Sequence, residues 1–199
     1  MPIDLAPASL QLARMVAAVP DARLGSATPC TEMTVGDLLH HVHTLAGAFT
    51  DAARKEDGPD SAPPPPARAA DLPADWRSEI ADRLGAFTEA WRDPAAWNGM
   101  SRIGGVDLPG EVVGLVGLNE LIVHGWDLAR STGQPFVADT SFLELLGPMV
   151  EQFAAPADAT PDELRARPFG LAVPVADDAP LLDRVLGLTG RDPRWRPPA

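Results

Sequence analysis

Apolar residues recur at helical spacing in four long segments of this chain, each bounded by proline, glycine or polar residues. The predicted helices span residues 4–19, 34–55, 75–92 and 109–133. In the second segment, Leu38, Val42 and Phe49 belong to one apolar stripe, which predicts a helix with one face in a core. Four such helices with short connections predict an all-α protein, built as an up-down four-helix bundle.

The ends of these helices carry residues that favour helix termini. Thr34 precedes the second helix and Asp37 follows three residues later, which is the spacing of a capping box. Gly133 follows the fourth helix, where glycine commonly ends a helix. Shorter helices are expected at 140–153 and 180–188, with another starting near Thr160.

A polar, proline-rich stretch at 56–74 separates the second and third predicted helices. Such a composition is typical of a surface loop, although its run of four prolines could also dock a proline-binding module. Too little chain precedes the stretch to form a separate core. The prediction is therefore one helical-bundle domain over 1–199, with a C-terminal extension at 158–199.

Composition argues against several classes of function. The chain has 28 acidic and 16 basic residues, for a net charge of −12, and such a surface repels nucleic acids and anionic lipids. Its one cysteine, Cys30, excludes an internal disulfide and fits a reducing cytoplasm. The sequence shows no signal peptide and no run of about twenty apolar residues. We expect a cytoplasmic monomer or homodimer with no nucleic-acid or membrane partner.

Ionisable residues interrupt the apolar fourth helix at helical spacing. Glu120 and His124 are four residues apart, so their side chains share one face, about one turn from each other. A carboxylate that points into a core is costly unless it is paired or binds a metal. Spacing alone leaves two interpretations open. In the first, Glu120 caps the helix or forms a salt bridge, and His124 is a core histidine. In the second, both residues belong to a metal site.

A second group of metal-ligating residues lies in the second helix, where His40, His41 and His43 fall within four positions. His40 points away from the apolar stripe, whereas His41 and His43 flank it on opposite sides. If the second and fourth helices are neighbours, either of these two could join the pair on the fourth helix. Two imidazoles and one carboxylate can bind a divalent metal and leave a position for water or substrate.

Two residues near these motifs have alternative roles. Asp127 could orient the imidazole of His124 or pair with Arg130, three residues further along the helix. Cys30 could be a redox-active thiol or a packed loop cysteine. The sequence contains no phosphate-binding loop, nucleophile elbow or nucleotide fingerprint. It therefore assigns no catalytic residue and no organic cofactor site.

Three segments resemble one known family. ATPCTEMTVGDLLHHVHTLAGAF, NELIVHGWDLARSTGQP and FGLAVPVADDAPLLDRVLGLTGRDPRW are similar, in this order, to segments of an actinobacterial family of metal-binding proteins. That family is related to the metal-binding domain of mycothiol-dependent maleylpyruvate isomerase, within the wider DinB-like group of helical bundles. The match covers almost the whole chain. It implies a DinB-like four-helix bundle with a short C-terminal extension.

The resemblance also implies a set of metal ligands. In the DinB-like group, a histidine on the second helix joins a Glu-x-x-x-His pair on a later helix. Matching DLLHHV to the family's helix places the first ligand at His41, and the second segment places the others at Glu120 and His124. Zinc is the expected metal, with nickel or another transition metal as the alternative.

The expected function is that of a metal-dependent enzyme acting on a small molecule. The reaction types are a thiol-dependent transferase or isomerase, with a low-molecular-weight thiol as partner, or a hydrolase. The isomerase has a longer C-terminal domain with basic residues that contact mycothiol and substrate, whereas only a short tail follows Asp158 here, so its specific activity is not carried over. The alternative is a non-catalytic helical bundle with a structural, degenerate or empty site.

Overall fold

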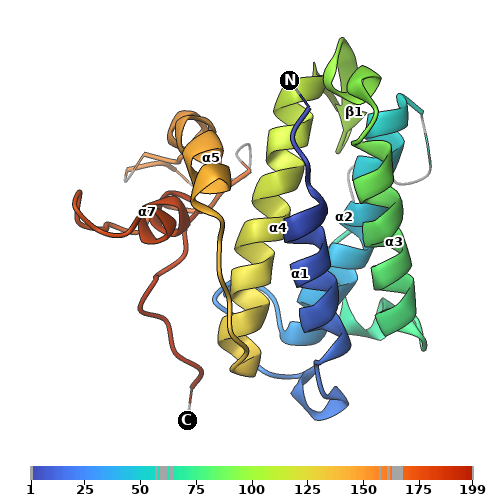
Figure 1. Cartoon of the computed structure of the whole chain (residues 1–199). Coiled ribbons are helices and arrows are strands. Elements are labelled where there is room, and N and C mark those ends of the chain that lie inside the picture. Colours follow the sequence, from blue (N-terminus) through green and yellow to red (C-terminus); the bar gives the residue numbers. More distant parts are fainter. Residues whose placement is uncertain are drawn as a thin grey trace. The chain divides into compact units, whose positions relative to one another are not determined.

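The computed structural model describes residues 2–198 except 57, 59–61, 63–64, 157, 161 and 163–167. The chain forms two compact units, Met1–Gln134 and Pro135–Ala199. The elements of the first unit (Figure 1) are α1 (Ala6–Ala17), η1 (Asp21–Arg23), α2 (Val35–Arg54), η3 (Ala69–Asp71), α3 (Trp76–Ala90), η4 (Pro94–Trp97), β1 (Met100–Ile103), β2 (Val106–Pro109) and α4 (Gly110–Thr132). The second unit contains α5 (Thr140–Phe153) and α7 (Leu181–Leu188).

The long helices begin and end close to the predicted residues. At the start of α2, the Thr34 hydroxyl accepts a hydrogen bond from the Asp37 amide, and the Asp37 carboxylate accepts one from the Thr34 amide. This confirms the capping box. Gly133 ends α4 in the left-handed conformation, with φ of 74°. The helix expected from Thr160 falls largely on residues outside the described part of the chain.

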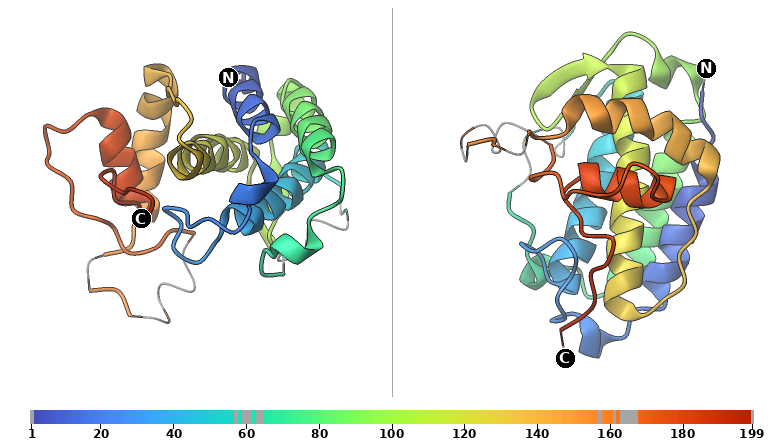
Figure 2. Two further views of the ribbon diagram at one scale, coloured as in Figure 1. Left: turned by 90° about the horizontal axis from the view of Figure 1, so that it is seen from below. Right: turned by 90° about the vertical axis from the view of Figure 1, so that its left-hand side faces the viewer.

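The four long helices of the first unit lie side by side as a bundle (Figure 2). α2 packs against α3 and α4, and α1 packs against the same two helices. The all-α class and the four-helix bundle are therefore confirmed. The neighbouring position of α2 and α4 is the condition that a shared metal site requires.

α2 and α3 run in the same direction along the bundle. The Arg68 amide, shortly before α3, donates to the imidazole of His40 near the start of α2. The indole of Trp91, at the end of α3, donates to the carbonyl of Phe49 near the end of α2. The end of α2 and the start of α3 therefore lie at opposite ends of the bundle, whereas they would be neighbours in a simple up-down bundle.

Tryptophan side chains fill the bundle next to the β1–β2 hairpin. The rings of Trp91 and Trp97 meet edge to face with centroids 5.0 Å apart, and the Trp97 indole donates to the Trp91 carbonyl. A Cβ on Gly114 of α4 would lie 2.5 Å from the Trp97 ring and 2.9 Å from the Trp91 ring. Glycine is required there for α4 to approach the two rings.

α4 is long and apolar enough to cross a membrane by length and composition alone, but 78% of its most apolar stretch is buried inside the protein. A core helix of a folded domain has the same properties, so this is weak evidence for a membrane span. The apolar character of α4 is explained by its place in the bundle, where Val113, Leu118 and Ile122 are buried.

Two helices lie in the described part of the second unit. α5 packs against α7, and the Val173 amide donates to the Gly187 carbonyl, which fastens an extended segment to the end of α7. This unit begins at Pro135, before the predicted extension at 158–199. The single domain over 1–199 stays a prediction.

Candidate metal centre

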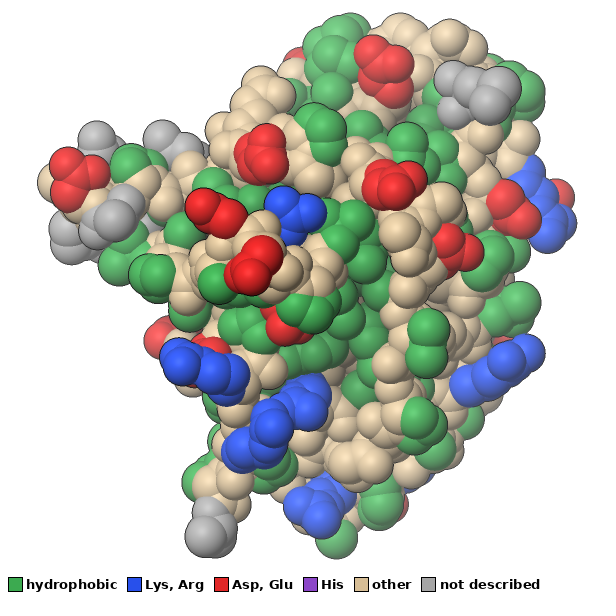
Figure 3. All heavy atoms as spheres, turned by 60° about the vertical axis from the view of Figure 1, so that its left-hand side comes forward, with side chains coloured by type: hydrophobic (Ala, Val, Ile, Leu, Met, Phe, Trp, Pro, Cys, Tyr) green, Lys and Arg blue, Asp and Glu red, His purple; other side chains and the backbone are tan. Residues whose placement is uncertain are grey.

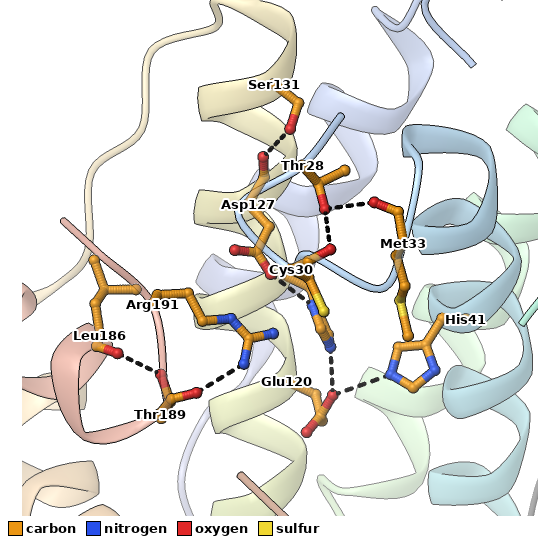
Figure 4. A network of polar contacts seen from close by, with 11 residues as sticks. Thr28, Cys30, Met33, His41, Glu120, Asp127, Ser131, Leu186, Thr189 and Arg191 are labelled. Carbon is orange, nitrogen blue, oxygen red and sulfur yellow. Dashed lines mark hydrogen bonds and ion pairs between the residues drawn. The ribbon is translucent and has the colours of Figure 1, made fainter. Parts of the chain in front are cut away.

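The three predicted ligands converge where α2 and α4 pack (Figure 4). Nε2 of His41 lies 3.6 Å from Oε2 of Glu120, and Nε2 of His124 lies 2.9 Å from the same oxygen. The two imidazole rings meet edge to face, with centroids 4.9 Å apart. One carboxylate oxygen is thus flanked by imidazole nitrogens from two different helices.

The spacing of these donor atoms fits a divalent transition metal. One ligand atom from each of the three residues lies within 4.8 Å of the others. In a tetrahedral site with bonds of about 2.0–2.1 Å, adjacent donor atoms are about 3.3 Å apart. The observed separations of 3.6 and 2.9 Å lie on either side of that value. Within the described part of the chain, no other group of His, Cys, Asp and Glu side chains has this spacing.

Asp127 holds His124 from the side opposite Glu120. Its Oδ2 lies 3.0 Å from Nδ1 of His124, and the residue is fully buried. When Nδ1 donates to this carboxylate, Nε2 is directed at Glu120. This geometry corresponds to the orienting role that the sequence left open for Asp127, while the Arg130 guanidinium lies over the Trp126 ring.

Opposite charges stabilise one another inside this site. Burial by itself lowers the pKa of His124, but the charge of Glu120 and hydrogen bonds with Asp127 and Glu120 raise it to about 9. Burial raises the pKa of Glu120, but His124 and His41 more than offset this and bring the pKa below its usual range. At neutral pH the metal-free site therefore holds an anionic Glu120 and a cationic His124. Because only neutral imidazole is a ligand, an incoming metal must displace the His124 proton.

The other histidines of α2 have different partners. Nε2 of His43 lies 3.1 Å from Oε2 of Glu79 on α3, and Nδ1 of His40 accepts from the Arg68 amide at 3.2 Å. His41 is therefore the histidine of α2 that faces Glu120, as the resemblance implied.

No histidine side chain is visible on the face shown in Figure 3, where acidic and basic side chains lie among hydrophobic ones.

Cys30 lies in the loop before α2 and is partly exposed. The hydroxyl of Thr28 is 2.9 Å from the Cys30 carbonyl and 2.8 Å from the Met33 carbonyl, which closes the loop on itself. The backbone of this loop is thus held by its own hydrogen bonds. A packed structural role and a redox role for the thiol both remain predictions.

A site of three ligands is expected to keep a position open for water or substrate, and a cavity borders two of the ligands, Glu120 and His124, inside the bundle. Most of its lining residues are apolar. Gly117, three residues before Glu120 on α4, also lines the cavity.

Replacing Asp127 by asparagine tests whether it supports His124. We expect Asp127→Asn to lower zinc affinity about 10- to 100-fold, because an acidic partner makes a ligating imidazole more basic and fixes its orientation. A competition titration against a chromophoric chelator measures this loss. An affinity equal to that of the unchanged protein would show that Asp127 serves only packing.

Comparisons with known proteins identify relatives of this chain. The family model described as "Mycothiol maleylpyruvate isomerase N-terminal domain" matches residues 5–129. Uncharacterized proteins from two strains of Mycobacterium tuberculosis are each 28% identical over 184 residues, which is 92% of this chain and 92% of theirs. Both of these relatives are mycobacterial proteins.

Solved structures of mycothiol-dependent maleylpyruvate isomerase share the fold. The crystal structure of that enzyme aligns with a TM-score of 0.58 at 19% identity, over 77% of this chain and 71% of that chain. A mutant of the enzyme aligns with a TM-score of 0.60 at 18% identity over the same shares. The DinB-like fold predicted from the sequence is confirmed.

Proposed function

The chain belongs to the mycothiol maleylpyruvate isomerase N-terminal domain family, and from this we propose that it is a metal-dependent enzyme acting on a small molecule. His41, Glu120 and His124 hold the metal, with zinc as the first candidate because imidazole and carboxylate donors suit it. The observation that carries the proposal is the position of the Glu120 oxygen between two imidazole nitrogens.

Three protein ligands are typical of catalytic rather than structural zinc sites, which usually have four. The side chains of His41 and Glu120 are 21% and 24% exposed, so the site is partly open to solvent. A bound divalent ion would supply a Lewis acid that lowers the pKa of a thiol or water. The single carboxylate leaves that charge partly uncompensated, which favours an anionic ligand.

A thiol-dependent isomerase or transferase is the reaction type we propose first. Its support is the family, since related proteins in it carry mycothiol in their name. Within this chain, Asp127 would keep His124 oriented and Glu120 would neutralise part of the charge. A cytoplasmic location and a monomeric or homodimeric state remain predictions.

One observation favours a second candidate, a non-catalytic bundle. Without a metal, Glu120 lies 2.9 Å from His124 and that histidine is held by Asp127. The ligand residues thus satisfy one another as an internal ion-pair network. In this alternative the network is structural, and the protein acts through its surface.

Metal binding and chelation separate the two candidates. We expect protein purified without a His-tag to bind one zinc or cobalt ion per chain, and the visible spectrum of the cobalt form to change when a small thiol is added. A chelator should remove the metal while the helical circular dichroism stays, because apolar faces on four helices form the core. The proposal of a metal-dependent enzyme would be contradicted if no thiol altered the cobalt spectrum. It would also be contradicted if the protein unfolded cooperatively when a chelator removed the metal.

A further inference from the structure

A small apolar cavity lies inside the first unit, next to the candidate metal centre. Its wall comes from all four long helices and includes Leu12, Phe49 and Phe87. Glu120 and His124 are the ionisable residues that line it. The space open to the centre of a water-sized sphere is about 20 Å³, which is enough for one water molecule or one methyl group.

Gly117 of α4 keeps part of this space open. A Cβ at this position would lie 3.2 Å from the Phe87 ring and 3.3 Å from the Phe49 ring. These contacts are tight but need only a few tenths of an ångström of adjustment, unlike the overlap of 2.5 Å that a Cβ on Gly114 would create with Trp97. Packing therefore does not demand a glycine at 117, although glycine inside a helix is less favourable than alanine.

The chemistry of the wall selects the occupant. A buried water needs two to four polar partners, and here the polar groups are Glu120 and His124, which already bind each other. A charged or hydroxylated group would lose its hydration against leucine and phenylalanine side chains. A methyl or methylene group has no hydrogen bonds with water to lose, and its transfer from water into the cavity is favourable.

We propose that this cavity is a subsite for one methyl-sized apolar group of a small ligand whose donor atom binds at the metal centre. The ligand is thus a short alkyl thiol, or a larger thiol with an apolar carbon close to the sulfur. This inference rests on the proposed function, because the metal centre holds the donor atom. The subsite would select ligands that carry an apolar carbon close to the donor group.

A thiol series on the cobalt-loaded protein tests the subsite. Along methanethiol, ethanethiol and 1-propanethiol, we expect affinity, measured from the cobalt spectrum, to rise about fourfold at the one step that adds the carbon entering the cavity. It should not rise at the other step. Gly117→Ala should abolish this rise and leave cobalt affinity unchanged. Gly85→Ala on α3 is the matched control, because a Cβ there meets nothing within 4 Å, and it should retain the rise.

A second variant covers the case in which Gly117→Ala fails to fold. Leu45 lines the same cavity and is only partly buried, so Leu45→Ala should fold and enlarge the space. We expect this variant to extend the rise in affinity to a longer thiol. Equal affinities along the series in the unchanged protein, or an unaltered series in both variants, would overturn the subsite.

Xenon binding to the metal-free protein separates this inference from the proposed function. Xenon under pressure should shift the methyl resonances of Leu121 and Val42, which line the cavity, and should not shift them in Gly117→Ala. No shift in the unchanged protein would overturn the apolar subsite. A protein that binds xenon but no cobalt would refute the proposed metal enzyme, and with it the ligand, while the cavity itself would stand.

Discussion

His124→Ala should weaken zinc binding by more than about 100-fold, because loss of a ligand costs more than the 10- to 100-fold loss that follows removal of an orienting partner. Two donor residues would remain, His41 on α2 and Glu120 on α4. His43→Ala should leave zinc affinity nearly unchanged, because its imidazole binds Glu79 on α3 and not the converging residues. Competition with a chromophoric chelator gives both affinities.

The two variants remove the same side chain from neighbouring helices of one bundle, so each serves as a control for the other. His43→Ala should still lower thermal stability slightly, because it removes the contact with Glu79 at 3.1 Å. His40→Ala gives a third comparison, since Nδ1 of His40 accepts from the Arg68 amide and not from the converging residues. Equal loss of zinc affinity in all three variants would mean that the ligands are assigned wrongly.

The bundle could be predicted because each long helix carries its own apolar stripe and its own end signals. Thr34 and Asp37 mark the start of α2 through local hydrogen bonds, which depend on residues three positions apart. The parallel course of α2 and α3 could not be predicted in this way. It depends on contacts between distant residues, such as the Trp91 indole with the Phe49 carbonyl.

The same distinction applies to the site. Glu120 and His124 could be paired from sequence because an α-helix brings residues four apart together. His41 and His43 flank the same stripe, and the choice between them depends on which neighbouring helix each one faces. The structure directs His41 to α4 and His43 to α3, and only the family resemblance had indicated this.

The contacts around the ligands depended even more on tertiary packing. Asp127 had two candidate partners at helical spacing, and the rotamer that brings its Oδ2 to His124 is a result of the packed bundle. The cavity required the joint shape of four helices. Gly117 was visible in the sequence, but a glycine inside a helix marks either a close contact, as at Gly114, or an open space.

Glu120→Gln should lower the pKa of His124 from about 9 to near or below the ordinary histidine value of about 6.5. The substitution keeps the shape of the side chain and removes its charge. Burial, which lowers the pKa of His124, is then opposed only by Asp127. Imidazole resonances in NMR spectra of the metal-free protein report this titration. Glu79→Gln is the matched control, because Glu79 faces His43, and it should leave the His124 titration unchanged.

The same variant should change how stability depends on pH. In the unchanged protein the folded pKa of His124, about 9, lies above the unfolded value of about 6.5. Its ion pair therefore stabilises the metal-free fold fully below pH 6.5, and this contribution is lost as the pH rises through 9. Urea unfolding at both pH values should show this loss in the unchanged protein and a smaller or reversed change in Glu120→Gln.

Zinc affinity should also fall in the variant, because a neutral amide is a poor ligand for zinc. If His124 titrates as before in Glu120→Gln, then Asp127 and not Glu120 supplies the charge that holds its proton.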